Sequence, residues 1–177
     1  MNKEKISVQL VVNHNHFCET LNQLSEKDFE KKPNQKWSAG QQLDHIIKSV
    51  QPFDMAMGLP SFVLKMKFGL ANRPSKTYDD LVTKYKNALE KNVGFEIPKE
   101  FDPNDIPFAK REKAMKKLQG LVQKLCKRMN KYSEEELDKY ILPHPLMGKV
   151  TLREMLYFTI YHVQHHEKQI FPNLNAA

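Results

Sequence analysis

The apolar residues of this chain recur at intervals of three and four positions, the spacing that gathers them on one face of an α-helix. This period predicts helices over the following segments: residues 5–24, 37–58, 77–92, 108–131 and 151–171. The last of them begins with the T-x-x-E capping signal of Thr151 and Glu154. We expect it to end at Pro172, because proline has no N–H with which to continue the helical hydrogen bonds.

The segments between these helices are polar or lack a period. Residues 25–36 indicate a loop with at most one turn of helix, and residues 93–107 carry three prolines and indicate a long surface loop. Residues 59–75 predict a short helix and a connection, which serves either as a cover over a pocket or as an exposed packing segment. With strands essentially absent, we predict an all-α fold, a single four-helix-bundle domain over residues 1–177 with one or two additional short helices.

The composition is that of an ordinary globular domain, and it also indicates the cellular compartment. The 177 residues are 40% hydrophobic and 28% charged, and the longest apolar runs are far too short to span a bilayer. The first twelve residues are too polar for a secretory signal. Cys18 and Cys126 lie far apart without a CxxC pattern, as is typical of reduced, packing cysteines. We therefore expect a cytoplasmic protein that does not enter a membrane.

The formal charge of +7 raises the question of a nucleic-acid partner. Much of it lies in residues 110–131, where nine Lys and Arg face one Glu. The same segment carries a regular apolar stripe made of Met115, Leu118, Val122, Leu125 and Met129. This pattern is typical of a bundle helix with a solvated basic face, and no nucleic-acid-binding motif accompanies it. We predict no specific nucleic-acid partner, and at most a weak attraction for anionic small molecules.

Histidines near the C-terminus offer the clearest chemistry. His162, His165 and His166 lie within five residues on one predicted helix. Two imidazoles three or four positions apart reach a common metal ion, so the spacing alone leaves the pair His162/His166 and the pair His162/His165 both open. A catalytic zinc ion typically has three protein ligands and one open position, so a third ligand must come from elsewhere. Polar histidines at a core boundary are the simpler alternative.

His45 is the candidate for that third position, while His14 and His144 lie elsewhere in the chain. His45 lies about 140° from the centre of its helix's apolar stripe, which by itself indicates a surface histidine, unless the helix has neighbours on two sides. His14 shares a face with apolar residues and is predicted to lie in the core or to line a pocket. His144 precedes the C-terminal helix and is placed by no periodicity.

Two separated motifs give the chain a resemblance to a known family. Trp37 to His45 reads W-S-x-x-Q-x-L-x-H, and Pro145 to Glu154 reads P-x-x-G-x-V-T-x-x-E before the H-x-x-x-H helix. In this order the motifs resemble the DinB/YfiT-like superfamily of metalloenzymes. The resemblance implies a four-helix bundle that holds a divalent transition metal, zinc or nickel, through His45, His162 and His166 together with water. It also implies a homodimer.

The same resemblance implies a function. Several characterised branches of the family are transferases or isomerases that use low-molecular-weight thiols such as bacillithiol or mycothiol, and other members resemble metal-dependent hydrolases. By this resemblance the chain is a hydrolase or a low-molecular-weight-thiol S-transferase. A metal held by three neutral histidines activates water or a thiol at neutral pH, so the expectation is an enzyme acting on a small-molecule substrate, with a thiol as cosubstrate in the transferase case. No motif fixes a catalytic base. Glu167 is the nearest carboxylate but points about 100° away from His166, and Tyr161 and His165 are candidates to orient the ligands.

Two alternatives belong to other functional classes. A non-catalytic metal-binding bundle with a structural or stress-related accessory role would close its metal site with a fourth ligand, for which His14 and His144 are the candidates. A metal-free interaction module would leave His45 far from the histidines of the C-terminal helix.

Overall fold

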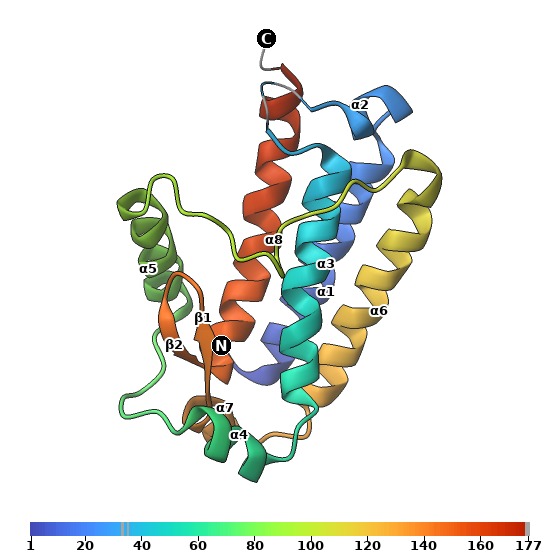
Figure 1. Cartoon of the computed structure of the whole chain (residues 1–177). Helices are drawn as coiled ribbons and strands as arrows, with labels where there is room; N and C mark the ends of the chain where they lie inside the picture. Colours follow the sequence, from blue (N-terminus) through green and yellow to red (C-terminus); the bar gives the residue numbers. More distant parts are fainter. Residues whose placement is uncertain (33, 35, 176–177) are drawn as a thin grey trace.

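Four long helices lie side by side in the computed structural model (Figure 1). They are α1 (Lys3–Asn22), α3 (Ala39–Met57), α6 (Arg111–Met129) and α8 (Leu152–Asn175). Both α1 and α3 pack against α6 and against α8, which closes the four into a bundle. The structure describes every residue except 33, 35, 176 and 177. The predicted all-α bundle is confirmed.

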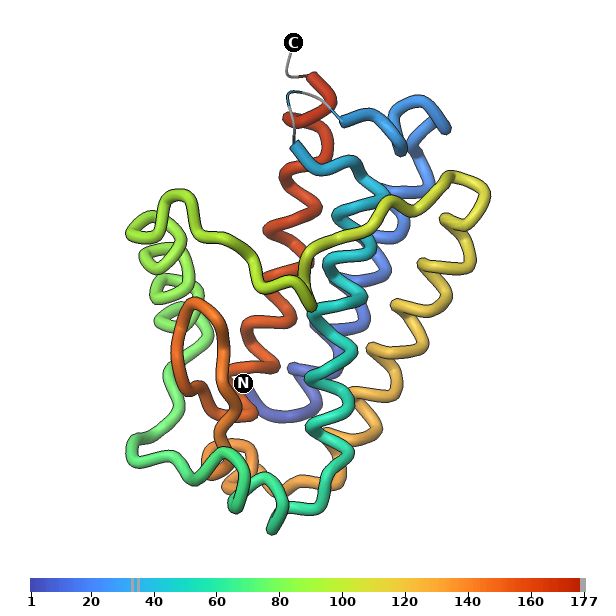
Figure 2. The backbone as a smooth tube through the Cα atoms, viewed as in Figure 1, coloured from blue at the N-terminus to red at the C-terminus, as the bar shows by residue number. Residues whose placement is uncertain are grey.

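Shorter elements join or flank the bundle. They are α2 (Glu26–Glu30), α4 (Ser61–Phe68), α5 (Tyr78–Lys91), the 3-10 turn η2 (Phe108–Lys110) and α7 (Glu134–Lys139). Helix α5 packs against α8 from outside the bundle (Figure 2). The predicted turn of helix within residues 25–36 is α2, and positions 33 and 35 of that segment lie outside the described residues.

The helix starts follow from local capping chemistry. Ser38 with Gln41 and Ser133 with Glu136 form capping boxes, in which each side chain bonds the backbone N–H of the other residue. The predicted apolar stripe of α6 is buried at every position, while the lysines of that helix are exposed. Within the described residues, none of the helices is both long and apolar enough to cross a membrane.

A β-hairpin before α8 was not predicted from the sequence. Strand β1 (Ile141–His144) pairs antiparallel with β2 (Gly148–Thr151), and His144 stands opposite Gly148. Each strand has only four residues, too few for a period of two to be visible, and Pro143 disfavours a strand. Gly148 adopts a φ of +70°, a conformation that glycine tolerates at the end of a tight turn.

The end of the last helix also differs from the prediction. Pro172 does not end α8, which continues to Asn175. A proline removes one backbone hydrogen bond but leaves φ in the helical range, so the final turn persists. Lys31 Nζ donates to the Leu174 carbonyl at 2.8 Å, which ties this turn to the segment after α2.

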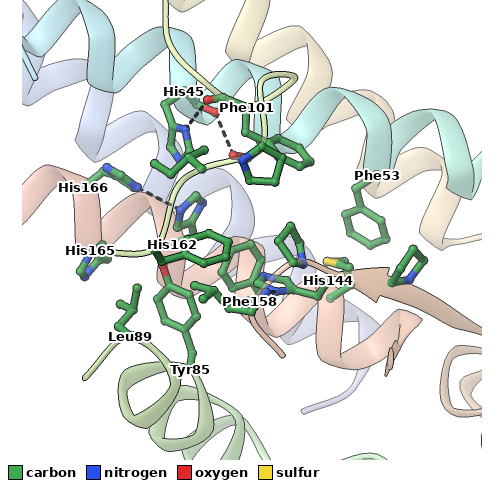
Figure 3. A pocket seen from close by; sticks show the side chains of 18 of the residues that line it. His45, Phe53, Tyr85, Leu89, Phe101, His144, Phe158, His162, His165 and His166 are labelled. Atoms are coloured by element: carbon green, nitrogen blue, oxygen red, sulfur yellow. Dashed lines mark hydrogen bonds between the residues drawn. The ribbon is translucent and has the colours of Figure 1, made fainter. Parts of the chain in front are cut away.

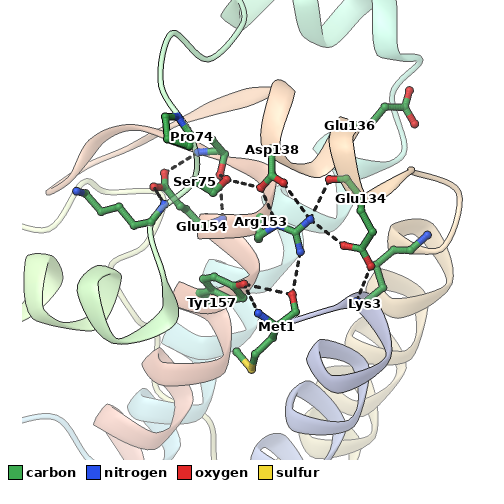
Figure 4. A network of polar contacts seen from close by, with 12 residues as sticks. Met1, Lys3, Pro74, Ser75, Glu134, Glu136, Asp138, Arg153, Glu154 and Tyr157 are labelled. Carbon is green, nitrogen blue, oxygen red and sulfur yellow. Dashed lines mark hydrogen bonds and ion pairs between the residues drawn. The ribbon is translucent and has the colours of Figure 1, made fainter.

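Polar contacts around the first turn of α8 join segments that are distant in sequence (Figure 4). The Arg153 guanidinium donates to Asp138 of α7 at 2.6 Å and to Glu134 at 2.8 Å. The buried carboxylate of Glu154 accepts from both terminal nitrogens of Arg73, at 2.6 and 2.9 Å. The connection between α4 and α5, helix α7 and the hairpin are thereby all fixed to the start of α8.

The long loop of residues 93–107 runs along the bundle rather than away from it (Figure 2). Asn104 N–H donates to the Asp44 carboxylate at 2.7 Å, and Lys48 Nζ donates to the Asp102 carbonyl at 2.6 Å. A Cβ atom on Gly40 would lie 2.7 Å from the Ile106 carbonyl oxygen, so only glycine permits this approach. The loop therefore covers the side of α3 that the sequence predicted to face solvent.

Candidate metal centre

Three histidines from two helices meet inside the bundle (Figure 3). His162 and His166 lie one turn apart on α8, and His45 reaches them from α3. One ring nitrogen of each histidine lies within 4.8 Å of the corresponding nitrogens of the other two. The three side chains are 5 or 6% exposed. The helical periodicity indicated a surface position for His45, but the side chain is buried. Helix α8 and the 93–107 loop cover that side of α3.

Carbonyl oxygens hold two of these rings in a defined orientation. His45 Nδ1 bonds the Phe101 carbonyl oxygen at 2.8 Å, and His166 Nδ1 bonds the Gln42 side-chain oxygen. Because these oxygens only accept hydrogen bonds, each Nδ1 carries the proton and each Nε2 keeps a free lone pair. An oxygen that holds the second ring nitrogen in this way is the usual companion of a metal-binding histidine.

The spacing of the remaining nitrogens suits a single ion. His162 Nε2 and His166 Nε2 lie 2.9 Å apart. Two nitrogens bound to one tetrahedral zinc ion at about 2.0 Å lie about 3.3 Å from each other. The pair needs only a small adjustment of the side chains to reach that separation.

Burial keeps all three imidazoles neutral. Burial holds the pKa of His162 well below its usual value, and the neighbouring His166 and His45 lower it further. Burial likewise holds the pKa of His166 well below its usual value, and His45 adds to the shift. The pKa of His45 is also lowered by burial, although its bond to the Phe101 carbonyl opposes the shift. Neutral imidazole is the form that binds transition metals. The cluster is therefore ready to bind at neutral pH without first losing protons.

Aromatic rings enclose the cluster on several sides. The Trp37 ring stacks on that of His166 with centroids 5.9 Å apart, and the Phe158 ring stacks on that of His162 at 4.5 Å. Tyr85 of α5 meets His162 edge-on at 6.2 Å. These rings exclude water from the sides of the cluster.

The three histidines line a cavity of about 610 Å³, which we call the histidine cavity. Its wall comes from α3, α5, α8, strand β1 and the segment from Asn92 to Phe101. Of residues 59–75, only Phe68 contributes, so α4 is for the most part not a cover; Phe62 and Met66 on α4 are exposed. A volume of this size accommodates a small molecule.

The other candidate histidines are not part of the cluster. His165 also lines the histidine cavity, and its Nε2 lies 2.9 Å from the Gln169 amide nitrogen. His144 lines the cavity on the far side of Phe158. His14 is buried in the bundle, where Nδ1 donates to the Leu10 carbonyl at 2.7 Å. Among the described residues, only His45, His162 and His166 form a group spaced for one metal ion.

Two further candidates lie apart from the cavity. Glu167 faces α1, where its carboxylate accepts from Thr20 at 2.6 Å and pairs with His16 at 2.5 Å. Tyr161 packs against Tyr85 with centroids 6.0 Å apart but does not line the cavity. Neither residue contacts the three histidines through a described hydrogen bond, and Glu167 is not placed to act as a base there.

Some residues of the site had no signal in the sequence. The Phe101 carbonyl belongs to a loop without a period, and Gln42 is a variable position of the W-S-x-x-Q-x-L-x-H motif. Tyr85 belongs to neither of the two motifs. A backbone carbonyl carries no mark of its role in the sequence, so the contact of Phe101 with His45 required the structure.

Comparison with known proteins agrees with this arrangement. The search among curated proteins returned no match. The family model of the DinB superfamily matches residues 9–170, a span that contains all three histidines and both motifs that carry the resemblance. The chain therefore belongs to the DinB superfamily.

Proposed function

We propose that the chain is a metal-dependent enzyme, a hydrolase or a low-molecular-weight-thiol S-transferase, acting on a small molecule in the histidine cavity. His45, His162 and His166 would hold a divalent transition metal, zinc or nickel. The observation that carries the proposal is that three neutral histidines converge at the wall of a cavity, with no fourth ligand among the described residues. Such a site leaves a coordination position open toward the cavity.

The donor set fits the metal. Three buried imidazoles suit zinc or nickel better than magnesium or calcium, which prefer oxygen ligands. When bound, the ion would activate a water molecule or a thiol by lowering its pKa. The chain has a separate part in the chemistry. The Phe101 carbonyl and the Gln42 amide orient His45 and His166. Trp37 keeps water from the side of His166, and Phe158 keeps it from the side of His162.

Tyr85 would contribute a hydrogen bond to the substrate. Its ring lines the histidine cavity and lies close to both His162 and His165. Burial raises the pKa of its hydroxyl, and Tyr161 adds to the shift. The phenol therefore stays protonated at neutral pH, where it acts as a donor rather than a base.

A non-catalytic metal-binding bundle is the alternative. It would be favoured by a fourth protein ligand, but neither His14 nor His144 belongs to the described group of three. The family resemblance also supports a homodimer, and Val8 and Val12, both 57% exposed and one turn apart on α1, offer an apolar face to such a partner.

Metal content tests the proposal. Wild-type protein, purified without a histidine tag, is expected to contain about one equivalent of zinc or nickel by elemental mass spectrometry. The variant His45→Ala/His162→Ala is expected to retain less than about a tenth of that, since one imidazole cannot hold the ion. His16→Ala, an exposed histidine on α1, is the matched control and should keep the wild-type content. A wild-type protein that neither carries nor takes up metal would contradict the proposal.

A further inference from the structure

The wall of the histidine cavity carries no formally charged side chain. None of the described residues that line it is Lys, Arg, Asp or Glu, although the chain holds 28 basic and 21 acidic residues. Aromatic and aliphatic side chains, among them Phe53, Phe68, Leu142 and Phe158, make up most of it. Away from the three histidines, an ion bound in the cavity would lose its hydration without gaining an opposite charge, which is unfavourable.

The backbone also fixes the position of the proton on His144, another polar group of the wall. It ends β1, and its Nδ1 accepts hydrogen bonds from the backbone N–H groups of Leu146 at 3.1 Å and Met147 at 3.2 Å. A nitrogen that accepts two such bonds carries no proton, so the proton of the neutral ring lies on Nε2. His144 is therefore a donor, fixed by the turn of the hairpin.

The Nε2 donor of His144 has no acceptor among the residues that the structure describes. No hydrogen bond joins this nitrogen to another residue within the described part of the chain. The nitrogen is also not fully buried. The ring packs edge-on against Phe158 with centroids 4.4 Å apart and lines the cavity (Figure 3). Lys84, the neighbouring cation, donates to the Met147 carbonyl at 2.7 Å and so serves the turn instead.

Phe158 relates this donor to the metal centre. The Phe158 ring stacks on the His162 ring with centroids 4.5 Å apart, and it meets the His144 ring edge-on with centroids 4.4 Å apart. A molecule lying along Phe158 would thus have one end near the three histidines and the other near His144 Nε2. At that far end, none of the described lining residues offers a charged side chain to a ligand.

We infer that the histidine cavity takes an uncharged, largely apolar substrate whose hydrogen-bond acceptor, a carbonyl or ether oxygen, is bound by His144 Nε2. His144 is thus a specificity-determining residue. The inference deepens the proposed function and rests on it only in taking the histidine cavity as the substrate site. It also disfavours a thiol cosubstrate with several carboxylates, which would need cationic partners in the wall.

Four probes that share a phenylalkyl group test the selectivity. They are 4-phenylbutanamide, 3-phenylpropane-1-sulfonate, trimethyl(3-phenylpropyl)ammonium and propylbenzene. The sulfonate and the quaternary ammonium are poor metal ligands, so they report the charge preference of the wall itself. Trp37, the only tryptophan, lines the cavity and reports binding through its fluorescence. The amide is expected to bind at least about tenfold more tightly than either ion, because the ions must be desolvated.

Two substitutions separate the donor from the turn. In His144→Asn the Oδ1 atom takes the place of Nδ1 and keeps the bonds to Leu146 and Met147, while the Nε2 donor is lost. In His144→Gln the side-chain nitrogen reaches the place of Nε2, while the acceptor for the turn is lost. We expect His144→Asn to weaken amide binding about fivefold, which is the size of one neutral hydrogen bond. Propylbenzene binding should be unchanged. His144→Gln should retain the preference for the amide over propylbenzene.

Several results would overturn the inference. These are binding of the sulfonate or the ammonium as tight as that of the amide, equal loss of amide and propylbenzene binding in His144→Asn, and no binding of any probe. Metal content measured on the same samples keeps the two proposals apart. A metal-free protein that shows the expected selectivity would contradict the metal-dependent function alone, while a metal-loaded protein without it would contradict the role of His144 alone.

Discussion

Replacing Glu154 by alanine is expected to lower the free energy of unfolding by about 3 kcal/mol, because two backbone N–H groups lose their acceptor and the half-exposed Arg73 loses its partner. The carboxylate is fully buried and accepts from Arg73 and from the backbone N–H groups of Lys76 at 2.8 Å and Thr151 at 2.9 Å. Burial alone would raise the pKa of Glu154, but these donors outweigh it and lower the pKa. Alanine leaves the two N–H groups without an acceptor. Urea unfolding followed by circular dichroism measures the loss.

Glu136 provides the matched control for this variant. It occupies the same third position of a capping box, at the start of α7, but it is only half-buried and pairs with no arginine. Glu136→Ala should cost no more than about 1 kcal/mol, the usual contribution of a helix cap. Equal losses in the two variants would show that Glu154 acts as an ordinary cap, without a contribution from its contact with Arg73.

Acid is expected to destabilise the protein through His14. Burial lowers the pKa of His14 to about 4, although the bond from Nδ1 to the Leu10 carbonyl opposes the shift, and the buried Nε2 has no partner among the described residues. Unfolded histidine has a pKa of about 6.5. Below that pH the unfolded chain takes up a proton that the folded chain refuses, so stability is lost as the pH falls from about 6.5 to about 4.

The variant His14→Leu isolates this contribution. Between pH 7.5 and pH 5.0, His14 is expected to account for about 2 kcal/mol of the loss in the wild type. The leucine variant should lose about that much less over the same interval, because it has no imidazole to protonate in the unfolded state. Urea midpoints at both pH values give the comparison, and His16→Leu, an exposed change on the same helix, should retain the full loss. A leucine variant with the acid sensitivity of the wild type would contradict the role of His14.

The sequence was sufficient for most of the helix starts, because their signals are local. Ser38, Thr77 and Ser133 each accept a backbone N–H three residues ahead, as their capping patterns predict. The hairpin escaped prediction because its four-residue strands are shorter than any periodic window, and because Pro143 disfavours a strand. Helix caps and amphipathic stripes are encoded within a few residues, whereas this strand pairing depends on a tight turn.

The site was predictable only in part. The spacing of His162, His165 and His166 on one helix indicated a metal pair but left two pairs open. The resemblance to the family selected His166 and added His45. Periodicity alone indicated the opposite for His45, because it measures the dominant face of a helix and not a second contact. That second contact is made by the 93–107 loop, whose Phe101 carbonyl holds the His45 ring. The burial of His45 therefore depends on chain far from it in sequence.

X-ray absorption at the zinc K-edge, on protein loaded with one equivalent of zinc, tests the central claim most directly. The three-histidine site predicts three imidazole nitrogens and one further light atom from water or buffer around the ion. His166→Ala should reduce the imidazole count or abolish binding. A fourth imidazole, a thiolate sulfur, or a spectrum unchanged in His166→Ala would contradict an open three-histidine centre at His45, His162 and His166.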